Sequence, residues 1–241
     1  MHRFFLKNFR QTENEIKIFN PEQIHQIKNV LRLKPGQEIT IFDSSGRQFL
    51  IILESINNFI TGKVIKEIKQ DIEPKIKIVL YQSLIKKDKF EWLIKQGTAL
   101  GISKFVPLIT DRSIVRRVSE EKFRRWQKIV QESTEQSGRT NIPIIAQPIN
   151  FKSLTKQILN KIALNLIGQP NAKKNLKQVL PEKKPKLINL FIGPEGGFSE
   201  SEIKLAKKLG LKLFRFGPRI LPAEFAGLAI ASVIFYHYNN I

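Results

Sequence analysis

The sequence predicts an α/β fold in which a parallel-sheet domain, residues 75–241, follows a small β-rich domain, residues 1–70. From Lys75 onward, apolar runs of strand length alternate with amphipathic helical segments, the pattern of a parallel sheet with crossover helices. Residues 1–70 instead hold short β-rich runs separated by turn sequences, which is typical of a small barrel or closed sheet. Two glycine-rich turns, at 193–197 and 217–222, directly follow predicted strands of the second domain.

The 241 residues carry a large positive charge: 41 Lys and Arg against 21 Asp and Glu, a net charge of +20 and a pI of about 10.2. Such a surplus attracts polyanions, above all nucleic acid, although lysines spread over a solvated surface give the same total. Guanidinium groups suit phosphate and base recognition, so grouped arginines and arginines beside glycines or aromatics favour nucleic acid. These residues are Arg112, Arg116, Arg117, Arg124, Arg125, Arg3, Arg47, Arg139 and Arg219.

Other chemistries are disfavoured by residue usage. There is no cysteine, and the three histidines, His2, His25 and His237, are far apart in sequence, so neither a thiol nucleophile nor a metal site is expected. The N-terminus lacks the apolar core of a signal peptide, and no window of transmembrane length is free of charge. We therefore expect a soluble, cytoplasmic protein without a membrane partner.

In the first domain, Asn20 and Pro21 predict the start of a helix over 21–31, with apolar residues on one face. Residues 69–75 read as the linker to the second domain. Strands are predicted over 15–19, 38–42, 48–54 and 59–68.

In the second domain, Ser199 and Glu202 have the spacing of a capping box and predict a helix that ends at Gly210. Asp88 is the expected cap of an earlier helix, which Gly101 ends. Strands are predicted over 76–81, 105–109, 162–167, 187–192 and 211–216, and helices over 88–101, 119–138, 199–210 and 223–238.

The turn Gly193-Pro194-Glu195-Gly196-Gly197 is neither a Walker A motif nor a GxGxxG fingerprint, and no lysine follows it to meet a phosphate. Alone it predicts a tight turn and a ligand cradle equally well. Gly168-Gln169-Pro170 and Gly217-Pro218-Arg219 follow neighbouring strands in the same way, and ligands bind at the carboxyl ends of parallel strands. Together the three turns predict a pocket lined by backbone groups, suited to an adenine and a ribose.

Three features of the sequence each allow two interpretations. Glu224 either favours the N-terminus of the last helix electrostatically or takes part in chemistry. The small residues of that helix suit a buried core helix or packing against a second copy of the chain. The segment 135–139, which ends in Arg139, predicts either the end of a helix with a favourable cation or an RNA contact.

Several segments together resemble the RsmE family, bacterial 16S rRNA uridine-N3 methyltransferases of the SPOUT superfamily. They are FIGPEGGFSESEI, FGPRIL, EQSGR, VPLITDRSIV and the N-terminal HRFF…HQIKNVLRL…G…ITIFD, and they follow in order over essentially the whole chain. The resemblance implies a PUA-like RNA-binding β-barrel followed by a SPOUT domain whose backbone forms a trefoil knot. It also implies S-adenosylmethionine bound in the knot and a homodimer built on knot-region helices.

The resemblance assigns roles to residues. The three turns become cofactor loops, Glu224 would orient or deprotonate the target base, and Arg219 would hold RNA phosphate or that base; no metal is implied. The implied cofactor residues are Ile167, Gly168, Gln169, Ile192, Gly193, Pro194, Glu195, Gly196, Gly197, Phe216, Gly217, Ile220, Leu221 and Ala223. The implied RNA contacts are Arg3, Arg32, Arg47, Arg112, Arg116, Arg117 and Arg139.

The chain departs from the family pattern at two places. Where the family usually reads Leu-Arg-x-Glu-Thr-Ala, residues 221–226 read LPAEFA, so Pro222 and Phe225 replace an arginine and a threonine. Where it reads Lys-Ala-Thr-Glu-Leu-Gly, residues 96–101 read QGTALG, with Ala99 in place of the glutamate. Two hypotheses follow: a methyltransferase acting on N3 of a uridine in 16S rRNA, or a catalytically weakened RNA-binding homologue that keeps the fold and dimer. A phosphate-handling enzyme is disfavoured, because the glycine turn lacks a lysine.

Overall fold

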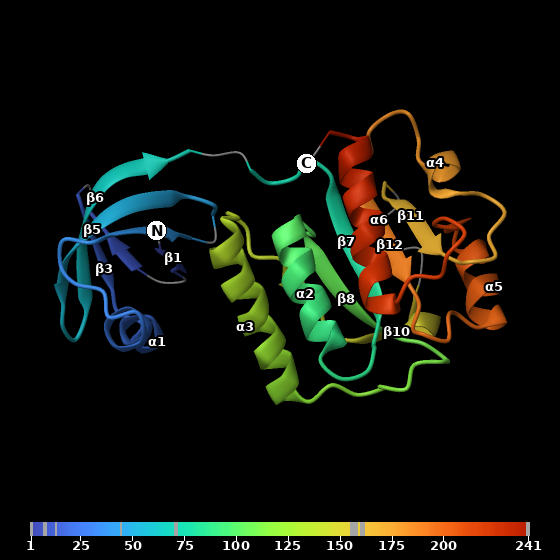
Figure 1. Cartoon of the computed structure of the whole chain (residues 1–241), viewed down its shortest axis with the longest axis horizontal. Coiled ribbons are helices and arrows are strands. Elements are labelled where there is room, and N and C mark those ends of the chain that lie inside the picture. Colours follow the sequence, from blue (N-terminus) through green and yellow to red (C-terminus); the bar gives the residue numbers. More distant parts are fainter. Residues whose placement is uncertain are drawn as a thin grey trace. The chain divides into compact units, whose positions relative to one another are not determined.

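The computed structural model describes residues 2–6, 9–12, 14–43, 45–69, 72–154, 159 and 162–239. The chain forms two compact units (Figure 1): residues 1–73 with 134–142, and residues 74–133 with 143–241. The segment 134–142, which the sequence pattern places in the second domain, thus belongs with the first. Within the predicted linker, Gln70 and Asp71 lie outside the described residues.

The first unit is built on one six-stranded sheet whose strand order is β1-β4-β5-β6-β3-β2. Neighbouring strands are antiparallel except for the parallel pair β1 and β4. Among the described residues no pairing joins β1 to β2, and the strands form one curled sheet around an apolar core. The strands are β1 (His2–Phe5), β2 (Phe9–Gln11), β3 (Glu15–Ile18), β4 (Glu38–Phe42), β5 (Gln48–Ile56) and β6 (Ile60–Ile68).

The predicted helix of the first unit changes its hydrogen-bond pattern part-way. The Asn20 side chain accepts bonds from the backbone N–H groups of Glu22 and Gln23, which starts helix α1 (Pro21–His25) as predicted. The following residues, Gln26–Val30, continue as one π-helical turn. Ile27 of this turn is fully buried in the core of the curled sheet.

The second unit is built on a parallel sheet whose order is β10-β8-β7-β12-β11-β13, with β9 also pairing with β8. Every described pair in it is parallel, which confirms the predicted sheet type. The two-residue strands β9 and β10 were not predicted, because such short segments show no periodicity. The strands are β7 (Lys77–Ser83), β8 (Lys104–Ile109), β9 (Ile144–Ile145), β10 (Ile149–Asn150), β11 (Leu164–Gly168), β12 (Leu187–Ile192) and β13 (Lys212–Phe214).

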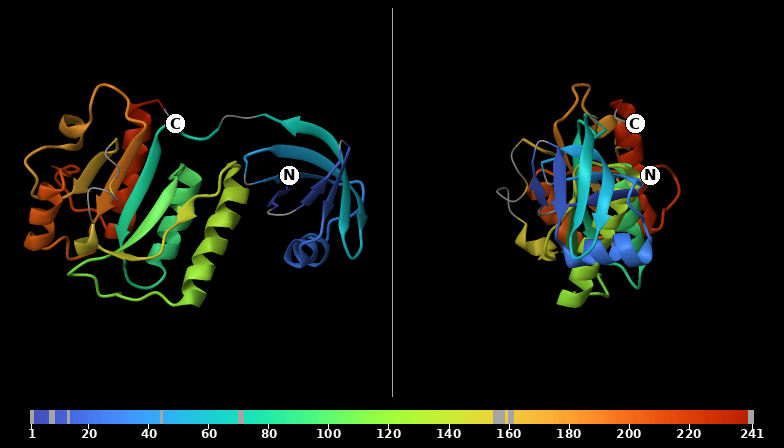
Figure 2. Two further views of the ribbon diagram at one scale, coloured as in Figure 1. Left: turned by 180° about the vertical axis from the view of Figure 1, so that it is seen from behind. Right: turned by 90° about the vertical axis from the view of Figure 1, so that its left-hand side faces the viewer.

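Helices cover both faces of this sheet (Figure 2). On one face, α6 packs against α2, β7 and β12, and Gly227 of α6 approaches Leu80 so closely that an added Cβ would lie 3.1 Å from its Cδ1. On the other face, α5 and a 3₁₀ turn at Phe151–Ser153 enclose an apolar cluster that includes Phe191. The helices are α2 (Lys89–Leu100), α3 (Glu120–Ser137), α4 (Leu176–Val179), α5 (Glu200–Lys208) and α6 (Ala223–His237). None of the helices in the described part of the chain is long and apolar enough to cross a bilayer.

The helix boundaries follow the sequence signals closely, with one difference. The capping box of Ser199 and Glu202 is present at the start of α5, and Gly101 ends α2 in the left-handed region with φ of 110°. Asp88 occupies the N-cap position of α2, but its side chain makes no capping hydrogen bond there.

After β13 the chain returns alongside the segment 169–186. The backbone N–H of Arg215 donates to the carbonyl of Lys174 at 2.9 Å, and the Lys184 ammonium donates to the carbonyl of Tyr238 at 3.0 Å. These bonds join the two segments; the resemblance implies that the backbone of this domain also forms a trefoil knot. The threading itself stays a prediction.

Candidate functional site

Three turns leave the same edge of the parallel sheet. Strand β11 lies between β12 and β13, and all three run in the same direction, so the turns after Gly168, Ile192 and Phe214 emerge side by side. The backbone N–H of Gln169 donates to the carbonyl of Phe214 at 2.8 Å, which ties the first turn to the last. The structure therefore brings the three predicted loops together.

The first glycine of the middle loop is closely packed against the protein itself, and the last one adopts a left-handed conformation. A Cβ added to Gly193 would lie 3.2 Å from a ring carbon of Phe198 and 3.3 Å from the Cα of Gly197. Gly197 has a φ of 67°, and its N–H donates to the carbonyl of Pro194 at 2.8 Å to close a tight turn. Gly217 in the last loop also has a positive φ, 72°. Both conformations favour glycine, so the backbone here is open to a ligand at close approach.

Arg112, which lies on the loop after β8, holds the middle loop from outside. Its Nη1 donates to the carbonyl oxygen of Gly196 at 2.7 Å. A Cβ added at Gly196 would lie 3.5 Å from the Cβ and the Cδ of Arg112, so the Arg112 side chain lies directly against the loop. Arg112 was predicted to contact RNA, whereas in the structure it acts on the glycine loop.

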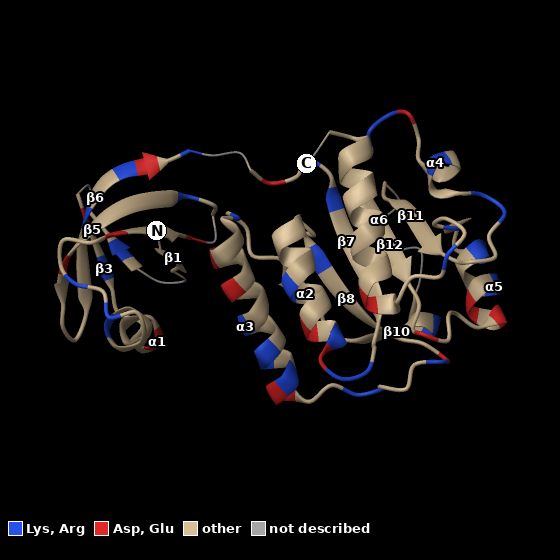
Figure 3. Ribbon diagram, viewed as in Figure 1, with Lys and Arg blue, Asp and Glu red and all other residues tan. Residues whose placement is uncertain are grey.

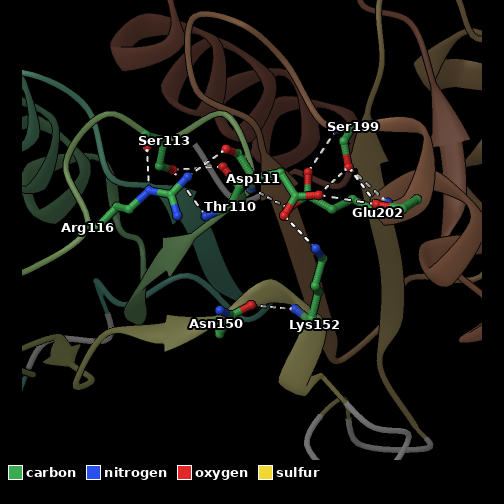
Figure 4. Close-up of polar contacts among 9 residues, drawn as sticks. Thr110, Asp111, Ser113, Arg116, Asn150, Lys152, Ser199 and Glu202 are labelled. Atoms are coloured by element: carbon green, nitrogen blue, oxygen red, sulfur yellow. Dashed lines mark hydrogen bonds and ion pairs between the residues drawn. The ribbon is translucent and has the colours of Figure 1, made fainter.

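Asp111 fastens the Arg112 loop to the start of α5 (Figure 4). Its Oδ2 accepts a hydrogen bond from the Ser199 hydroxyl at 2.7 Å, and its Oδ1 pairs with the Lys152 ammonium at 2.7 Å. Its backbone N–H donates to the buried Glu202 carboxylate at 2.9 Å, so the capping box of α5 also holds this loop. The Lys152 and Ser199 bonds lower the pKa of Asp111 to about 2, so the carboxylate is ionised at any working pH.

Glu224, in the first turn of α6, pairs with a lysine from α2. Its Oε1 lies 2.7 Å from the Lys89 ammonium, and the Glu224 side chain is 18% exposed. Partial burial acts to raise the pKa of Glu224, but the Lys89 hydrogen bond, a backbone hydrogen bond and the charge of Lys89 together outweigh it, so the pKa is lowered. The same bond raises the pKa of Lys89, with a smaller contribution from the charge of Glu195. The sequence pattern gives no sign of Lys89, because it lies 135 positions from Glu224 and only the packing of α2 on α6 joins them.

The second carboxylate oxygen of Glu224 is buried and, among the described residues, has no hydrogen-bond partner. A buried carboxylate oxygen without a donor is costly, so a donor from a ligand would be favourable at this atom.

Arg219, predicted to hold RNA phosphate or the target base, is exposed. Among the described residues its guanidinium makes no hydrogen bond or ion pair, so it is available to a ligand.

The predicted cofactor residues differ in their burial. The residues that are buried are Ile167, Ile192, Gly193, Pro194 and Ala223. Those that are exposed are Glu195, Gly196, Gly217 and Ile220, and the half-buried ones are Gly168, Gln169, Gly197, Phe216 and Leu221.

The predicted RNA contacts of the first unit do not form an open basic surface. Arg139 is 5% exposed and donates to Glu73 at 2.6 Å, so its guanidinium is not offered to a phosphate and we no longer assign it to RNA. Arg3 is half-buried over the Phe42 ring, and burial lowers its pKa. Arg47 is exposed but pairs with Asp43 at 2.7 Å. Arg32 is exposed, with a positive φ of 52°, and stays a predicted RNA contact.

The positive charge is carried by the second unit (Figure 3), where Lys and Arg occur on the loops, α4 and α5. Its residue ranges contain 29 Lys and Arg against 11 Asp and Glu, whereas those of the first unit contain 12 against 10. Arg116 and Arg117 of the second unit are exposed, although Arg116 also donates to the backbone of Asp111 at 3.0 Å. Among the described residues, no group of three or more acidic or histidine side chains is placed to bind a metal.

Comparison with known proteins places both units. A model of an RNA methyltransferase domain matches residues 72–235, and a model of an RNA methyltransferase PUA domain matches residues 19–69. The ribosomal RNA small subunit methyltransferase E of Mesomycoplasma hyopneumoniae (strain 232) is 32% identical over 231 residues, covering 95% of this chain and 96% of the relative. The chain belongs to the ribosomal RNA small subunit methyltransferase E (RsmE) family. The RsmE protein of Bacillus subtilis (strain 168) is 30% identical, covering 98% of this chain and 96% of its own.

A solved RsmE structure agrees over the whole length. The enzyme from Neisseria gonorrhoeae, bound to S-adenosyl methionine, superimposes with a TM-score of 0.87 at 28% identity, covering 98% of each chain. The fold of this RsmE-family chain is thus a PUA-like curled sheet followed by a parallel-sheet methyltransferase domain, as the resemblance implied.

Proposed function

We propose that this chain transfers a methyl group from S-adenosylmethionine to N3 of a uridine in the 16S rRNA of the small ribosomal subunit. Membership of the RsmE family and the cofactor bound to its Neisseria gonorrhoeae relative support the reaction class. The observation that carries the proposal is the meeting of three backbone-lined loops with the Glu224–Lys89 pair at one edge of the sheet.

The loops fit the cofactor. Gly193 is closely packed against Phe198 and Gly197, whereas a Cβ added at Gly197 or Gly217 would meet no protein atom within 4 Å. The backbone at these two glycines is therefore open to an adenine or a ribose that binds by hydrogen bonding. The proposed cofactor residues are those of the three loops, 167–169, 192–197 and 216–223. S-adenosylmethionine, when bound, supplies a methyl group on a sulfonium ion that is open to in-line attack.

The protein must then position the uridine and remove the proton from its N3. The Glu224 carboxylate is ionised and has one oxygen free of donors among the described residues, so it can accept the N3–H of the imide. The Lys89 ammonium lies on the other carboxylate oxygen, and its positive charge favours the negative charge that develops on the imide as the proton leaves. Arg219, exposed on the last loop, is placed to bind a phosphate or the base.

Lys89 compensates for the difference between this chain and the usual family sequence at residue 222. Where the family usually has an arginine, Pro222 takes the N-cap position of α6, and its fixed φ suits the start of a helix. The cation lost there is supplied from α2 by Lys89, 2.7 Å from Glu224. This pairing favours an active enzyme over a catalytically weakened homologue.

The partners follow from charge and exposure. The basic second unit, with Arg116 and Arg117, would attract the rRNA backbone. Apolar side chains of α6 and the preceding loop are exposed and suit a homodimer interface; they are Ile220 at 82%, Phe225 at 46%, Val233 at 42% and Tyr236 at 75%.

Because ribosomes are assembled in the cytoplasm, we place the protein there.

The test is transfer of a labelled methyl group to small-subunit rRNA that lacks the modification, followed by digestion to nucleosides and mass spectrometry. The expected product is N3-methyluridine, at a single position. Transfer to a ribose, or cofactor binding without any transfer, would contradict the proposal, and the second outcome would favour the weakened homologue.

Arg112→Ala is expected to weaken binding of S-adenosylmethionine by roughly tenfold, because the Gly196 carbonyl loses a charge-assisted hydrogen bond worth about 1.5–3 kcal/mol. Isothermal titration calorimetry measures the affinity. Arg117→Ala is the matched control, since Arg117 is exposed on the same loop and makes no described side-chain bond. Equal affinities of the two variants would show that Arg112 does not hold the cofactor loop.

A further inference from the structure

The first unit belongs to an RNA-modifying family, yet it is almost neutral. Its residue ranges hold 12 Lys and Arg against 10 Asp and Glu, and two of these arginines, Arg47 and Arg139, are paired with carboxylates. Binding by release of counterions needs several free cations along the phosphate backbone, which this unit does not concentrate. A contribution of this unit to RNA binding must therefore come from other contacts.

Two phenylalanine rings lie exposed at one end of the curled sheet. Phe19 directly follows β3, and Phe59 directly precedes β6, next to it in the sheet because Ile18 pairs with Ile60. Their ring centroids are 6.0 Å apart, and the ring planes are inclined by 34°. Phe19 is 44% exposed and Phe59 41%, so neither ring is part of the core beneath them.

Arg10, on the edge strand β2, completes this group. Its guanidinium carbon lies 5.5 Å from the centroid of the Phe19 ring, in a cation–π contact. Among the residues that the structure describes, Arg10 forms no ion pair, so its N–H groups remain available to a ligand. Arg10, Phe19 and Phe59 together are called the aromatic platform below.

A hollow of about 380 Å³ in the same unit reaches Asn57, two residues before Phe59. Its charged lining residues are Lys28, Lys34 and Glu54, so the two lysines outnumber the single carboxylate. A ring surface with a guanidinium, close to two lysines, matches the chemistry of a nucleotide: a base face, its hydrogen-bonding edge and a phosphate.

We propose that the aromatic platform binds an unpaired nucleobase of the RNA substrate, with Lys28 and Lys34 receiving the adjacent phosphates. This inference rests on the proposed function, since it assumes that RNA is the substrate. The base stacks on the exposed faces of Phe19 and Phe59, and Arg10 donates to its edge. A duplex hides its base faces, so the platform selects single-stranded or looped RNA.

The test uses the full chain and a fluorescein-labelled oligouridine of twelve nucleotides, with binding followed by anisotropy at several salt concentrations. The double variant Phe19→Ala/Phe59→Ala is expected to bind about 10-fold to 100-fold more weakly, since stacking on one aromatic ring contributes that much per base. The slope of log affinity against log salt should stay unchanged, because no charge is removed. In a second oligonucleotide, one base is replaced by 2-aminopurine, whose fluorescence is quenched when it stacks. The parent chain should quench this fluorescence on binding, and the double alanine variant should not.

Ile65→Ala is the matched control: Ile65 is 44% exposed on β6 of the same sheet but lies outside the platform. Phe19→Trp/Phe59→Tyr should restore binding, as each ring retains a stacking face. The inference would be overturned if the double alanine variant bound as tightly as Ile65→Ala, or if it quenched 2-aminopurine as the parent chain does. Circular dichroism spectra matching the parent chain are required of all variants before comparison.

The outcome is separable from that for the proposed function. With rRNA as substrate, the double alanine variant should raise KM and leave kcat unchanged. Methyl transfer by the parent chain with no change of KM in the variant would reject the platform alone. Loss of oligouridine binding in the variant, with no methyl transfer by the parent chain, would reject the methyltransferase alone.

Discussion

Glu224→Gln should abolish most methyl transfer, lowering kcat by about 100-fold or more, the range expected when a general base is lost. An amide cannot accept the N3 proton, and it leaves the Lys89 ammonium without its counter-charge. Binding of S-adenosylmethionine should change little, because the loops that hold it are backbone-lined. Single-turnover transfer of labelled methyl to rRNA, with calorimetric cofactor titration alongside, gives both quantities.

Glu200→Gln provides the control, because Glu200 is also a first-turn glutamate but is exposed at the start of α5. A second variant, Lys89→Met, tests the pair through pH. The Lys89 bond lowers the pKa of Glu224, so kcat in the parent chain should fall only below the ordinary glutamate range. Without Lys89 the pKa rises and the acid limb moves to higher pH. An acid limb in the same place would show that Glu224 is not the base.

Glu73→Ala should destabilise the first unit by roughly 3–5 kcal/mol, the usual effect of removing one partner of a buried ion pair. The Arg139 side chain is 6% exposed and would keep its charge without a carboxylate. The backbone N–H groups of Thr140 and Asn141 would lose their acceptor as well. Urea unfolding followed by far-ultraviolet circular dichroism measures the change. Both tryptophans, Trp92 and Trp126, lie in the second unit, so their fluorescence should report a smaller shift.

Glu15→Ala is the matched substitution within the same unit, since its pair with Lys17 is 35–41% exposed, and such pairs contribute about 0–1 kcal/mol. Burial acts to raise the pKa of Glu73, but the bonds and charge of Arg139, together with the backbone N–H groups of Thr140 and Asn141, outweigh it, so the pKa is lowered. The stability that the Glu73–Arg139 pair gives to the first unit is therefore fully present above the ordinary glutamate pKa, and it is lost as pH falls through the lowered pKa of Glu73. Equal midpoints for the two variants would contradict the structural role of Glu73.

The sequence predicted those parts of the fold in which local signals agree with packing. The apolar run 187–192, buried on both faces, and the capping box at Ser199 identified β12 and α5 with little error at their ends. Strand β1 was missed, because its four residues, HRFF, show no alternation of polar and apolar side chains, and it is held by parallel pairing with β4, which is distant in sequence. The π turn after α1 has no local signature of its own, since its pattern is that of an ordinary helix.

The candidate site was predictable where backbone mattered and not where side chains meet across the fold. Glycines after three consecutive strands marked the loops, because parallel strands bring their carboxyl ends to one edge. Lys89 at Glu224, Arg112 at Gly196 and Glu73 at Arg139 are joined only by tertiary packing. Charge alone also misled, because the net total of +20 concealed that the first unit is nearly neutral.

The first unit is made from two pieces of chain, 1–73 and 134–142, with sixty residues of the other unit between them. During synthesis the N-terminal sheet must therefore wait, with Glu73 unpaired, until Arg139 has left the ribosome. A fragment that stops at residue 73 lacks this closing segment and should fold poorly. For the same reason, the first unit cannot be exchanged between proteins by a single recombination at the end of β6.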